Sequence, residues 1–262
     1  MRPSLSNPSL SRNNLSAVTS PLTSSSYFIA DLHLDPANEQ GLKLAVDFFS
    51  NIHGTHALYI LGDLFEYWIG DDAGIPLYAD VVQSIEALAL SGCRVTFMHG
   101  NRDFLIGETL AAACHASLVC DDELMITLDD APVLLMHGDT LCTDDTAYQG
   151  LRSQMRDKHW QSRFLAQTID ERVAYAQQLR QQSRTSSAGK TAQIMDVNEL
   201  QVNERLRFNQ TKTLIHGHTH KPAVHHYPDT NSQRYVLGDW HSDHAQYVVH
   251  DSHGLQLRTF TA

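Results

Sequence analysis

The segment YFIADLH, residues 27–33, couples a short apolar run to the side chains of Asp31 and His33. Short apolar runs bounded by glycine and polar residues are typical of buried strands. The same arrangement recurs at ALYILGD (57–63), VTFMHGN (95–101), VLLMH (133–137) and TLIHGHTH (213–220). In sheets with parallel strands, ligands gather beyond the carboxyl ends of the strands. The polar ends of these five segments are therefore predicted to meet at one edge.

Helical periodicity separates the first three of these strands. Apolar residues recur at helical spacing over residues 40–52, 77–90 and 104–113, which predicts alternating strands and helices in the first third of the chain. Later segments alternate or carry β-branched and aromatic residues. They are expected to form antiparallel strands that complete a second sheet, at 223–227, 234–237, 246–250 and 255–260.

The polar residues that end the five segments are of the types that hold pairs of divalent ions. Two such ions can clamp a phosphate group and activate water, but they need a shared anionic ligand and several nitrogen and oxygen ligands. Asp63 is the natural shared ligand. Imidazole and carboxylate together favour Mn, Fe or Zn, whereas an all-oxygen set would indicate Mg or Ca. We therefore expect two divalent ions, with manganese as the first candidate.

Each motif alone has an ordinary structural explanation. Asp31 could be a helix N-cap, and Asn101 could be a turn residue. The spacing of His216 and His218 is more informative, because alternate residues of an extended segment point the same way, and His220 follows. Five such fragments, each closing an apolar run, favour a metal site over five coincidences.

The order D-x-H, GD, GN, H and GHxH resembles the calcineurin-like metallophosphoesterase superfamily. The resemblance implies a four-layer αββα sandwich, an α/β fold with two mixed sheets flanked by helices. It implies that one metal is held by Asp31, His33, Asp63 and His218. It implies that the other is held by Asp63, Asn101, His137 and His216. The nearby His99 and His220 are expected to be hydrogen-bonding or solvent-facing residues, outside the ligand set.

Longer strings narrow the resemblance to one family, the UDP-2,3-diacylglucosamine hydrolases of lipid A biosynthesis. The strings are YFIADLHL, LYILGDLFEYWIGDD, HGNRDFLIG, LLMHGDTLCTDD, IMDVN and LIHGHTHKPAVH. The resemblance implies a dinuclear metal-dependent phosphoric-anhydride hydrolase. Metal-activated water would attack the α-phosphorus of UDP-2,3-diacylglucosamine and release UMP and 2,3-diacylglucosamine 1-phosphate (lipid X).

Arg102 stands where many phosphatases and nucleases of the superfamily have histidine. Arginine does not give up its proton, so the expected role is electrostatic. Arg102 would stabilise charge on the phosphate under attack, and together with Asp63 it forms the expected catalytic pair. The alternative is a structural salt bridge from Arg102 to Asp103 or to another carboxylate.

The resemblance also assigns contacts with the substrate. They fall on Asn101, Arg102, Asp145, Ser183, Lys190 and His216, with Tyr148 and Arg180 as lesser candidates. Ser187 is a further candidate, although the family commonly has asparagine there and a hydroxyl cannot replace an amide's paired donor and acceptor. Asp145 has a competing role as the N-cap of the following helix.

A long excursion between two ligand-bearing strands is expected to form a helical cap over residues 146–211, inserted between core segments 27–145 and 212–262. From Leu151 to Ile215 there are eleven basic and six acidic residues, within a chain of net charge −11. The segment also carries an apolar stripe at helical spacing that includes Trp160, Phe164, Ile169 and Val173. The stripe could pack the cap onto the core, or it could receive acyl chains while the cap contacts an anionic membrane. The acyl chains implied by the resemblance favour the second interpretation.

Composition restricts the partners and the location. The acidic net charge argues against a nucleic-acid partner, and nothing implies an obligate protein partner. No apolar run is long enough to cross a membrane. Residues 1–26 lack the apolar stretch of a signal peptide and are expected to form a disordered extension. We therefore expect a cytoplasmic protein, peripherally associated with the cytoplasmic face of the inner membrane.

Two other functions remain open at this stage. A calcineurin-like nucleotide or dinucleotide pyrophosphohydrolase with a soluble substrate would share the metal site but would not need an apolar cap. A non-enzymatic, metal-dependent lipid-binding scaffold would bind metal and lipid without turnover.

Overall fold

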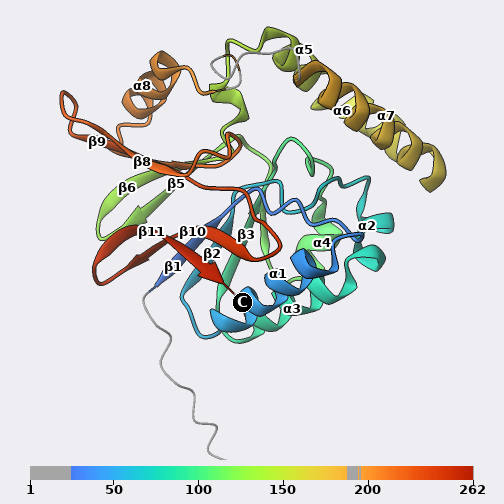
Figure 1. Cartoon of the computed structure of the whole chain (residues 1–262), viewed down its shortest axis with the longest axis horizontal. Coiled ribbons are helices and arrows are strands. Elements are labelled where there is room, and N and C mark those ends of the chain that lie inside the picture. Colours follow the sequence, from blue (N-terminus) through green and yellow to red (C-terminus); the bar gives the residue numbers. More distant parts are fainter. Residues whose placement is uncertain (1–24, 188–193, 195, 262) are drawn as a thin grey trace, which may run out of the picture.

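Six of the strands form a mixed sheet around the segment that carries Asp31. The computed structural model describes residues 25–187, 194 and 196–261. The sheet order is β11-β10-β1-β2-β3-β4 (Figure 1). Strands β1 to β4 run parallel, and β10 and β11 are each antiparallel to their neighbours. The bounds are β1 (Ser26–Ile29), β2 (Ala57–Ile60), β3 (Arg94–Met98), β4 (Ser117–Val119), β10 (His244–Asp251) and β11 (Gly254–Thr261).

A second mixed sheet has the order β5-β6-β7-β9-β8, in which β6, β7 and β9 run parallel. Its strands are β5 (Glu123–Leu128), β6 (Ala131–Met136), β7 (Thr213–His216), β8 (Ala223–Tyr227) and β9 (Ser232–Val236). The expectation that all the C-terminal strands are antiparallel and complete this sheet was wrong. Strand β9 is parallel to β7, and β10 and β11 extend the first sheet beside β1. Periodicity identifies a strand but does not identify its partner.

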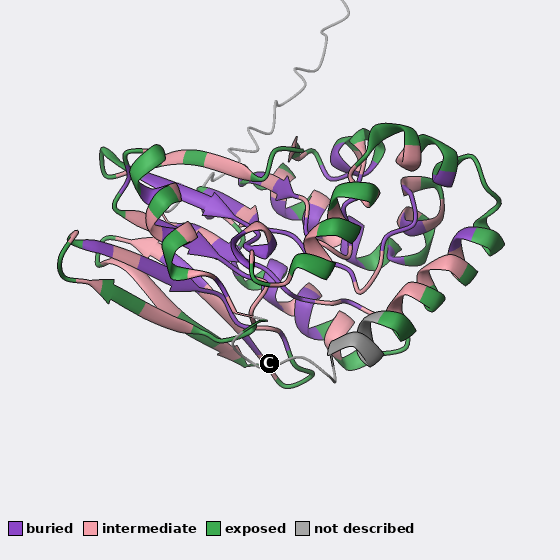
Figure 2. Ribbon diagram, turned by 90° about the horizontal axis from the view of Figure 1, so that it is seen from above, coloured by how far each residue is buried: buried purple, intermediate pink, exposed green. Residues whose placement is uncertain are grey.

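The two sheets pack face to face, and helices cover both outer faces. Within β1, Phe28 points into the layer between the sheets, whereas Ile29 packs against the helical layer. The first sheet is covered by α1 (Glu39–Asn51), α2 (Asp71–Leu77), α3 (Ala79–Leu90) and α4 (Glu108–Ala113). Helix α8 (Glu199–Phe208) buries Val202 and Leu206 against the second sheet. This is the predicted αββα order, and Figure 2 shows the buried residues concentrated in the sheets.

Three helices stand apart from these layers, after a short 3-10 helix η1 (Asp139–Leu141): α5 (Thr146–Met155), α6 (Lys158–Leu165) and α7 (Ile169–Ser187). The buried Arg172 ties α7 to the core, because its Nη1 donates to the carbonyl of Ile69 at 2.5 Å and to Oδ1 of Asp72 at 2.9 Å. We call α5 to α7 the cap helices. Helix α8 lies within the predicted 146–211 segment but belongs to the outer layer of the second sheet; the domain boundaries themselves stay a prediction.

Two expectations concern the ends of the chain and the membrane. The predicted extension over residues 1–26 lies outside the described residues except for Ser25 and Ser26, and Ser26 already begins β1. Within the described ranges, we find no helix with the length and apolar character needed to span a bilayer.

Candidate metal centre

The carboxyl ends of strands from both sheets meet at one edge, where the turns that follow them carry the candidate ligands. Strands β1, β2 and β3 contribute from the first sheet, and β6 and β7 contribute from the second. The converging residues are Asp31, His33, Asp63, Asn101, His137, His218 and His220. The edge predicted from the five apolar runs is therefore the place where carboxylate, amide and imidazole groups gather.

Five of these residues adopt a left-handed backbone conformation: φ is 57° at Asp31, 46° at His33, 53° at Asp63, 69° at His218 and 53° at His220. A residue with a Cβ atom adopts this conformation at a cost, and such residues cluster at functional sites. Backbone hydrogen bonds between the turns hold two of them, because the amide of His33 donates to the carbonyl of Asp63 at 3.0 Å and that of Asp31 to Gly62 at 3.2 Å.

The glycines of the GN and GH motifs allow other segments to approach the carboxylates closely. A Cβ atom on Gly100 would lie 2.1 Å from Oδ1 of Asp63, and one on Gly217 would lie 2.3 Å from Oδ2 of Asp31. Both distances are far shorter than any van der Waals contact. Only glycine fits these two positions without displacing Asp31 or Asp63.

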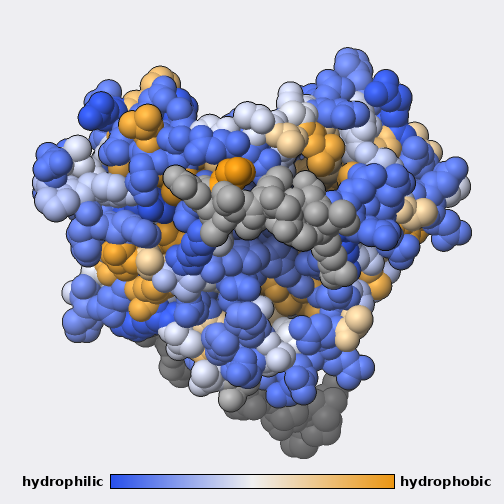
Figure 3. Space-filling view, turned by 45° about the horizontal axis from the view of Figure 1, so that its top comes forward, coloured by the Kyte–Doolittle hydropathy of each residue, from blue (hydrophilic) through white to orange (hydrophobic). Residues whose placement is uncertain are grey.

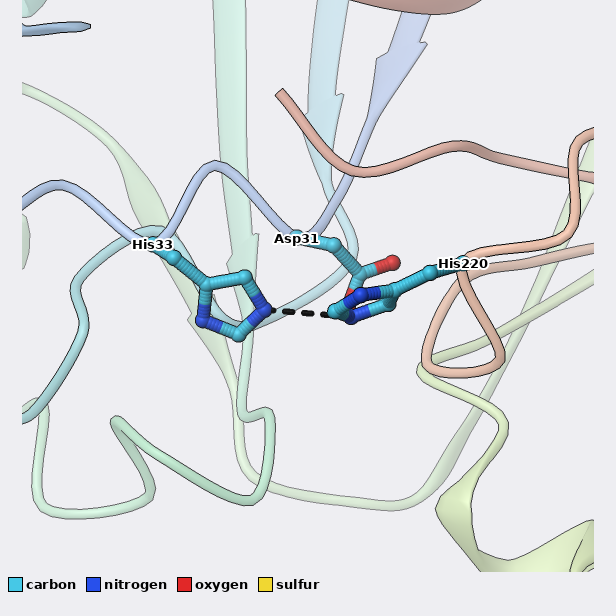
Figure 4. Close-up of side chains that lie close together, drawn as sticks. All are labelled: Asp31, His33 and His220. Atoms are coloured by element: carbon cyan, nitrogen blue, oxygen red, sulfur yellow. Dashed lines mark hydrogen bonds and ion pairs between the residues drawn. The ribbon is translucent and has the colours of Figure 1, made fainter. Parts of the chain in front are cut away.

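Asp31, His33 and His220 form one group with metal-ligand geometry (Figure 4). The Nε2 atoms of the two imidazoles face each other at 3.1 Å, and Oδ1 of Asp31 lies 3.6 Å from Nε2 of His220. On the other side of the His220 ring, Nδ1 is 3.6 Å from Oδ2 of Asp239. Burial disfavours the charged imidazole, but the carboxylates of Asp239 and Asp31 outweigh it and raise the pKa of His220 to about 10. A carboxylate behind a ligating histidine is the usual device that orients the ring toward a metal.

Asn101 connects the neighbouring group, whose other members include His137 and His218. Its Oδ1 lies 2.9 Å from Nε2 of His137 and 2.8 Å from Nδ1 of His218. The other nitrogen of His137, Nδ1, donates to the carbonyl of Leu61 at 2.9 Å. This bond fixes the tautomer, so the lone pair of Nε2 faces the centre.

Asp63 lies between the two groups. Its Oδ2 is 3.8 Å from Nε2 of His33, and its Oδ1 is 3.8 Å from Nε2 of His137. One carboxylate oxygen therefore faces each group, which is the geometry that a shared ligand requires.

His216 points away from this centre, in contrast to the sequence-based ligand set. Its ring is fully buried, with Nδ1 donating to the carbonyl of Gly217 at 2.8 Å and Nε2 accepting from Nη1 of Arg234 at 3.2 Å. Burial and the Arg234 cation lower the pKa of His216 to about 3. With both nitrogens engaged, His216 cannot ligate a metal at the centre, and its assignments as ligand and substrate contact are corrected. His216 and His218 are separated by the same spacing as His218 and His220, so spacing alone does not choose between the two pairs. The GHxH motif begins at Gly217, however, and its two histidines are therefore His218 and His220. This alignment was the indication for His220 in the sequence.

Paired variants distinguish the two histidines. We expect His220→Ala to lose one of two bound metal ions, because it removes an imidazole from the centre. His216→Ala should keep both ions and lower the melting temperature instead, since it leaves a buried donor of Arg234 without its acceptor, at a cost of about 1–3 kcal/mol. Elemental analysis and thermal unfolding of both variants test this. Loss of metal from His216→Ala alone would restore the original assignment.

Glu66 is a member of the site that the sequence analysis missed. Its Oε2 lies 3.3 Å from Nδ1 of His33, and its Oε1 lies 3.6 Å from Nη1 of Arg102 and 2.9 Å from Nε of Arg180. Burial would raise the pKa of Glu66, but His33 and the two arginines lower it overall. The spacing D-x-x-E from Asp63 was the only indication in the sequence, and it is shared by many surface turns.

Asp103 has a structural role that the sequence analysis did not assign. Its buried carboxylate accepts from the backbone amides of Asp63 at 3.1 Å, Leu64 at 2.8 Å and Gly100 at 2.9 Å. Asp103 therefore fixes the turn of Asp63 against the turn of Asn101. Arg102 pairs with Glu66 and not with Asp103, so the salt-bridge alternative for Arg102 involves Glu66.

The first cap helix, α5, is fastened over the metal centre. The hydroxyl of Tyr148 and Nε of Arg152 both donate to Oδ2 of the buried Asp139 at 2.6 Å. One turn further on, Nη2 of Arg156 donates to the carbonyl of Gly100 at 2.9 Å. The ring of Tyr148 lies 5.9 Å from that of His218. These bonds explain how an inserted segment holds a defined position above the ligands.

An apolar cavity of about 340 Å³ opens between the cap helices and the core. It adjoins the metal centre at Asn101 and Arg102, and Tyr148 and Arg180 also line it. Most of its wall is hydrocarbon or aromatic, supplied by Trp68, Ile69, Phe104, Leu105, Leu151, Met155, Trp160, Phe164, Tyr175, Ala176 and Leu179.

Of the remaining predicted substrate contacts, only Asp145 has a described side chain. Asp145 is the N-cap of α5 and accepts from the amide of Tyr148 at 3.1 Å, as its competing assignment proposed. Ser183 and Ser187 belong to α7, but their side chains fall outside the described part of the chain, as does Lys190 altogether. Substrate contacts at these positions stay predictions.

Comparison with known proteins identifies the family. The model of the family "Calcineurin-like phosphoesterase" matches residues 26–222. The chain is 42% identical to a UDP-2,3-diacylglucosamine hydrolase of Hahella chejuensis, over 90% of this chain and 97% of the relative. It is 45% identical to a protein of the same name from Aromatoleum aromaticum, over 88% of this chain and 94% of that one. The chain therefore belongs to the calcineurin-like phosphoesterases and, among them, to the UDP-2,3-diacylglucosamine hydrolase family.

Proposed function

We propose that this protein hydrolyses the pyrophosphate bond of UDP-2,3-diacylglucosamine to give UMP and 2,3-diacylglucosamine 1-phosphate. Relatives that share 42% and 45% of its residues carry that hydrolase name. The main observation in support is that the candidate metal centre adjoins the apolar cavity at Asn101 and Arg102. A centre suited to phosphate, placed beside a space suited to hydrocarbon, matches a substrate that joins a diphosphate to acyl chains.

We infer that the centre holds two divalent ions. The buried Oδ1 of Asp31 has no hydrogen-bond partner among the residues that the structure describes, which leaves this oxygen available to a cation. One ion would be held by Asp31, His33, Asp63 and His220, and the other by Asp63, Asn101, His137 and His218. This mixture of nitrogen and oxygen donors suits Mn. When bound, the ions supply positive charge to the phosphate and acidify a water molecule.

The side chains around the ions have separable roles in this proposal. The carboxylate of Asp63 sets the spacing of the two groups, because each of its oxygens faces one of them. Arg102 lies where the apolar cavity meets the centre, and its permanent positive charge would stabilise the phosphate under attack. Asp103 and Gly100 hold the turn of Asp63 against the turn of Asn101.

The proposal is tested by assaying the purified protein with UDP-2,3-diacylglucosamine and with UDP-N-acetylglucosamine, which lacks acyl chains, in the presence of Mn, Mg or Zn. We expect UMP release from the diacylated substrate and little from the other, with Mn as the most effective ion. Equal rates on both substrates would indicate a soluble-nucleotide pyrophosphohydrolase. Tight binding of metal and lipid without turnover would indicate a scaffold.

The aromatic wall of the apolar cavity supports its assignment to the acyl chains. The rings of Trp160 and Phe164 are stacked with centroids 5.1 Å apart, and Tyr175 packs against both. The other half of the predicted stripe behaves differently. Ile169 is 45% exposed, and Val173 is partly buried against the hydrophobic cluster but does not line the cavity. The stripe thus contains residues that line the cavity and residues that do not.

Phe164→Gln is expected to lower kcat/KM for the diacylated substrate by about tenfold or more, since burying an apolar side chain is worth about 1.5–3 kcal/mol. Hydrolysis of a water-soluble phosphodiester such as bis(p-nitrophenyl) phosphate should change much less. Phe208→Gln is the matched control, because Phe208 is 73% exposed on α8 and does not line the cavity. If the variant loses activity equally on both substrates and its melting temperature falls, Phe164 only packs the cap against the core.

We also propose that the outer surface of the cap helices rests on the membrane, at the cytoplasmic face of the inner membrane. Leu165 and Ile169, which do not line the apolar cavity, are 41% and 45% exposed there. Figure 3 shows a mainly hydrophilic surface with separate hydrophobic patches, one of them over the cap helices. Replacing Leu165 and Ile169 with Ser should reduce co-sedimentation with anionic vesicles. Unchanged co-sedimentation would show that Leu165 and Ile169 do not contact the membrane.

A further inference from the structure

A second hollow borders the candidate metal centre on the side of the second sheet. Its volume is about 800 Å³, and it lies between the start of α8, the turn after His220, and strands β8 and β9. We call it the α8 groove. The residues that decide its chemistry are Asp196, Val197, Glu199, Lys221, Pro222 and Arg234.

The α8 groove and the apolar cavity reach the metal centre at different residues. The groove touches the centre at Thr219, between His218 and His220, whereas the cavity touches it at Asn101 and Arg102. Among the described residues, the two linings have no member in common. A ligand held at the centre can therefore extend one arm into each space.

The charges of the α8 groove do not favour a second phosphate. Nζ of Lys221 lies 2.6 Å from Oδ2 of Asp196, and Nη2 of Arg234 lies 2.8 Å from Oε1 of Glu199. Each cation of the groove thus already faces a carboxylate, and a third carboxylate, that of Asp144, accepts from the side-chain Nδ2 of Asn198 at 3.0 Å. An anion placed here would meet carboxylates as well as cations, so the groove suits a neutral group with several donors and acceptors.

The same groove has an apolar component. Val197 and Val236 are buried, and Pro222 and Ala223 lie beside them in the lining. A flat ring can rest on such a surface while hydroxyl and carbonyl groups at its edge reach the paired charges. A nucleoside has this combination, because its base is planar and its ribose carries hydroxyl donors.

We propose that the α8 groove binds the uridine of the substrate, with the diphosphate crossing the metal centre and the acylated sugar directed into the apolar cavity. This inference rests on the proposed function, which supplies the nucleotide. The carboxylates of Asp196 and Glu199 accept from the ribose hydroxyls, and Lys221 donates to a carbonyl of the pyrimidine. The apolar cavity and the groove with its paired charges then divide the substrate by the chemistry of their linings.

Two neighbouring histidines of β8 provide a matched test. His225 is exposed and lines the α8 groove, whereas His226 is exposed and lies outside that lining. Tryptophan is well tolerated in strands, and at position 225 it would occupy part of the groove. The full-length, metal-loaded protein and its His225→Trp and His226→Trp variants are titrated calorimetrically with UMP and with methyl phosphate. We expect His225→Trp to weaken UMP binding by about tenfold, equivalent to about 1.4 kcal/mol, and to leave methyl phosphate unchanged. His226→Trp should change neither affinity.

Three results would overturn the inference: unchanged UMP affinity in His225→Trp, wild-type affinity for UMP no greater than for methyl phosphate, or loss of UMP binding on replacing Trp160 of the apolar cavity with Ala. Melting temperatures and metal content confirm that the variants are folded and loaded. Failure of the proposed function is distinguishable, because it would appear as no release of UMP from UDP-2,3-diacylglucosamine, a reaction that the titrations do not use.

Discussion

Asp63→Ala is expected to reduce turnover of UDP-2,3-diacylglucosamine by at least about 10⁴-fold, the scale observed when a central catalytic group is removed. The two oxygens of Asp63 face the two candidate metal groups, at 3.8 Å from His33 and 3.8 Å from His137. Without this carboxylate, both ions lose a ligand and nothing screens their mutual repulsion. The measurement is kcat together with the metal content of the purified variant.

Asp63→Asn separates the charge of this side chain from its structural role. Oδ1 of Asp63 accepts from the backbone amide of Arg102 at 2.8 Å, and an asparagine oxygen can keep that bond. We therefore expect Asp63→Asn to melt close to the wild type yet lose activity and metal as Asp63→Ala does. Asp243→Ala serves as the control, because Asp243 is exposed and lies in the loop before β10. Two bound ions and a near-normal rate in either Asp63 variant would exclude the shared-ligand role.

The position of the site could be predicted from sequence because of a simple physical rule. Buried parallel strands read as short apolar runs, and their carboxyl ends share an edge, so the residues after each run must be neighbours. Asp31, Asp63 and His137 follow β1, β2 and β6 in this way. No knowledge of the loops is needed for this step, since the sheet itself brings the segments together.

The choice between His216 and His220 could not be made by the same rule. Both lie two residues from His218, and which of them faces the centre depends on where β7 ends and the chain turns. Strand β7 ends at His216, where Arg234 of β9 meets the ring of this residue, and the left-handed turns at His218 and His220 redirect the chain toward Asp31. The contact with Arg234 of β9 and the reversal of the backbone after β7 therefore determine which histidine faces the centre. The periodicity of the sequence gives no information on either feature.

Long-range partners also explain why Glu66, Asp103 and the last two strands were misjudged or overlooked. Asp103 acts through three backbone amides from two turns, so its side-chain type gives no indication of its role. Strands β10 and β11 have suitable residues for either sheet. Pairing of β10 with β1 is a tertiary choice that local patterns do not express.

The cap helices both line the cavity and attach to the core. Helices α6 and α7 present Trp160, Phe164 and Tyr175 toward the cavity, while Arg172 attaches α7 to the core. Tyr148 and Arg152 bind Asp139, which directly follows the His137-Gly138 turn. The position of the cap and the position of the ligand-bearing turn are thus set by the same hydrogen bonds. Disturbing α5 should therefore affect both lipid selectivity and the metal centre, whereas a change confined to α6 should affect only the first.

Arg102→Ala is expected to lower kcat by about 10²–10³-fold while metal content stays unchanged, the usual scale for deleting one preorganised electrostatic contact. The backbone of Arg102 supports Asp63, but its side chain is directed to the mouth of the apolar cavity and lies 3.6 Å from Glu66. The alanine variant keeps the backbone bond and removes only the guanidinium. Steady-state kinetics with UDP-2,3-diacylglucosamine and elemental analysis give the two readouts.

Two further variants decide whether Arg102 acts on the phosphate or merely neutralises Glu66. Arg102→Lys should recover only part of the rate, since an ammonium keeps the charge but loses the planar pair of donors that fits a phosphate. Arg180→Ala is the matched control, because Arg180 also pairs with Glu66, at 2.9 Å, from the cap side. If the role of Arg102 is to neutralise the charge of Glu66, Arg102→Ala and Arg180→Ala should lose comparable activity. Arg102→Lys should then retain most of the wild-type activity. If Arg102 stabilises the phosphate, its alanine variant should be far more damaging than that of Arg180, because only a charge beside the reacting phosphate gains strength as negative charge accumulates there.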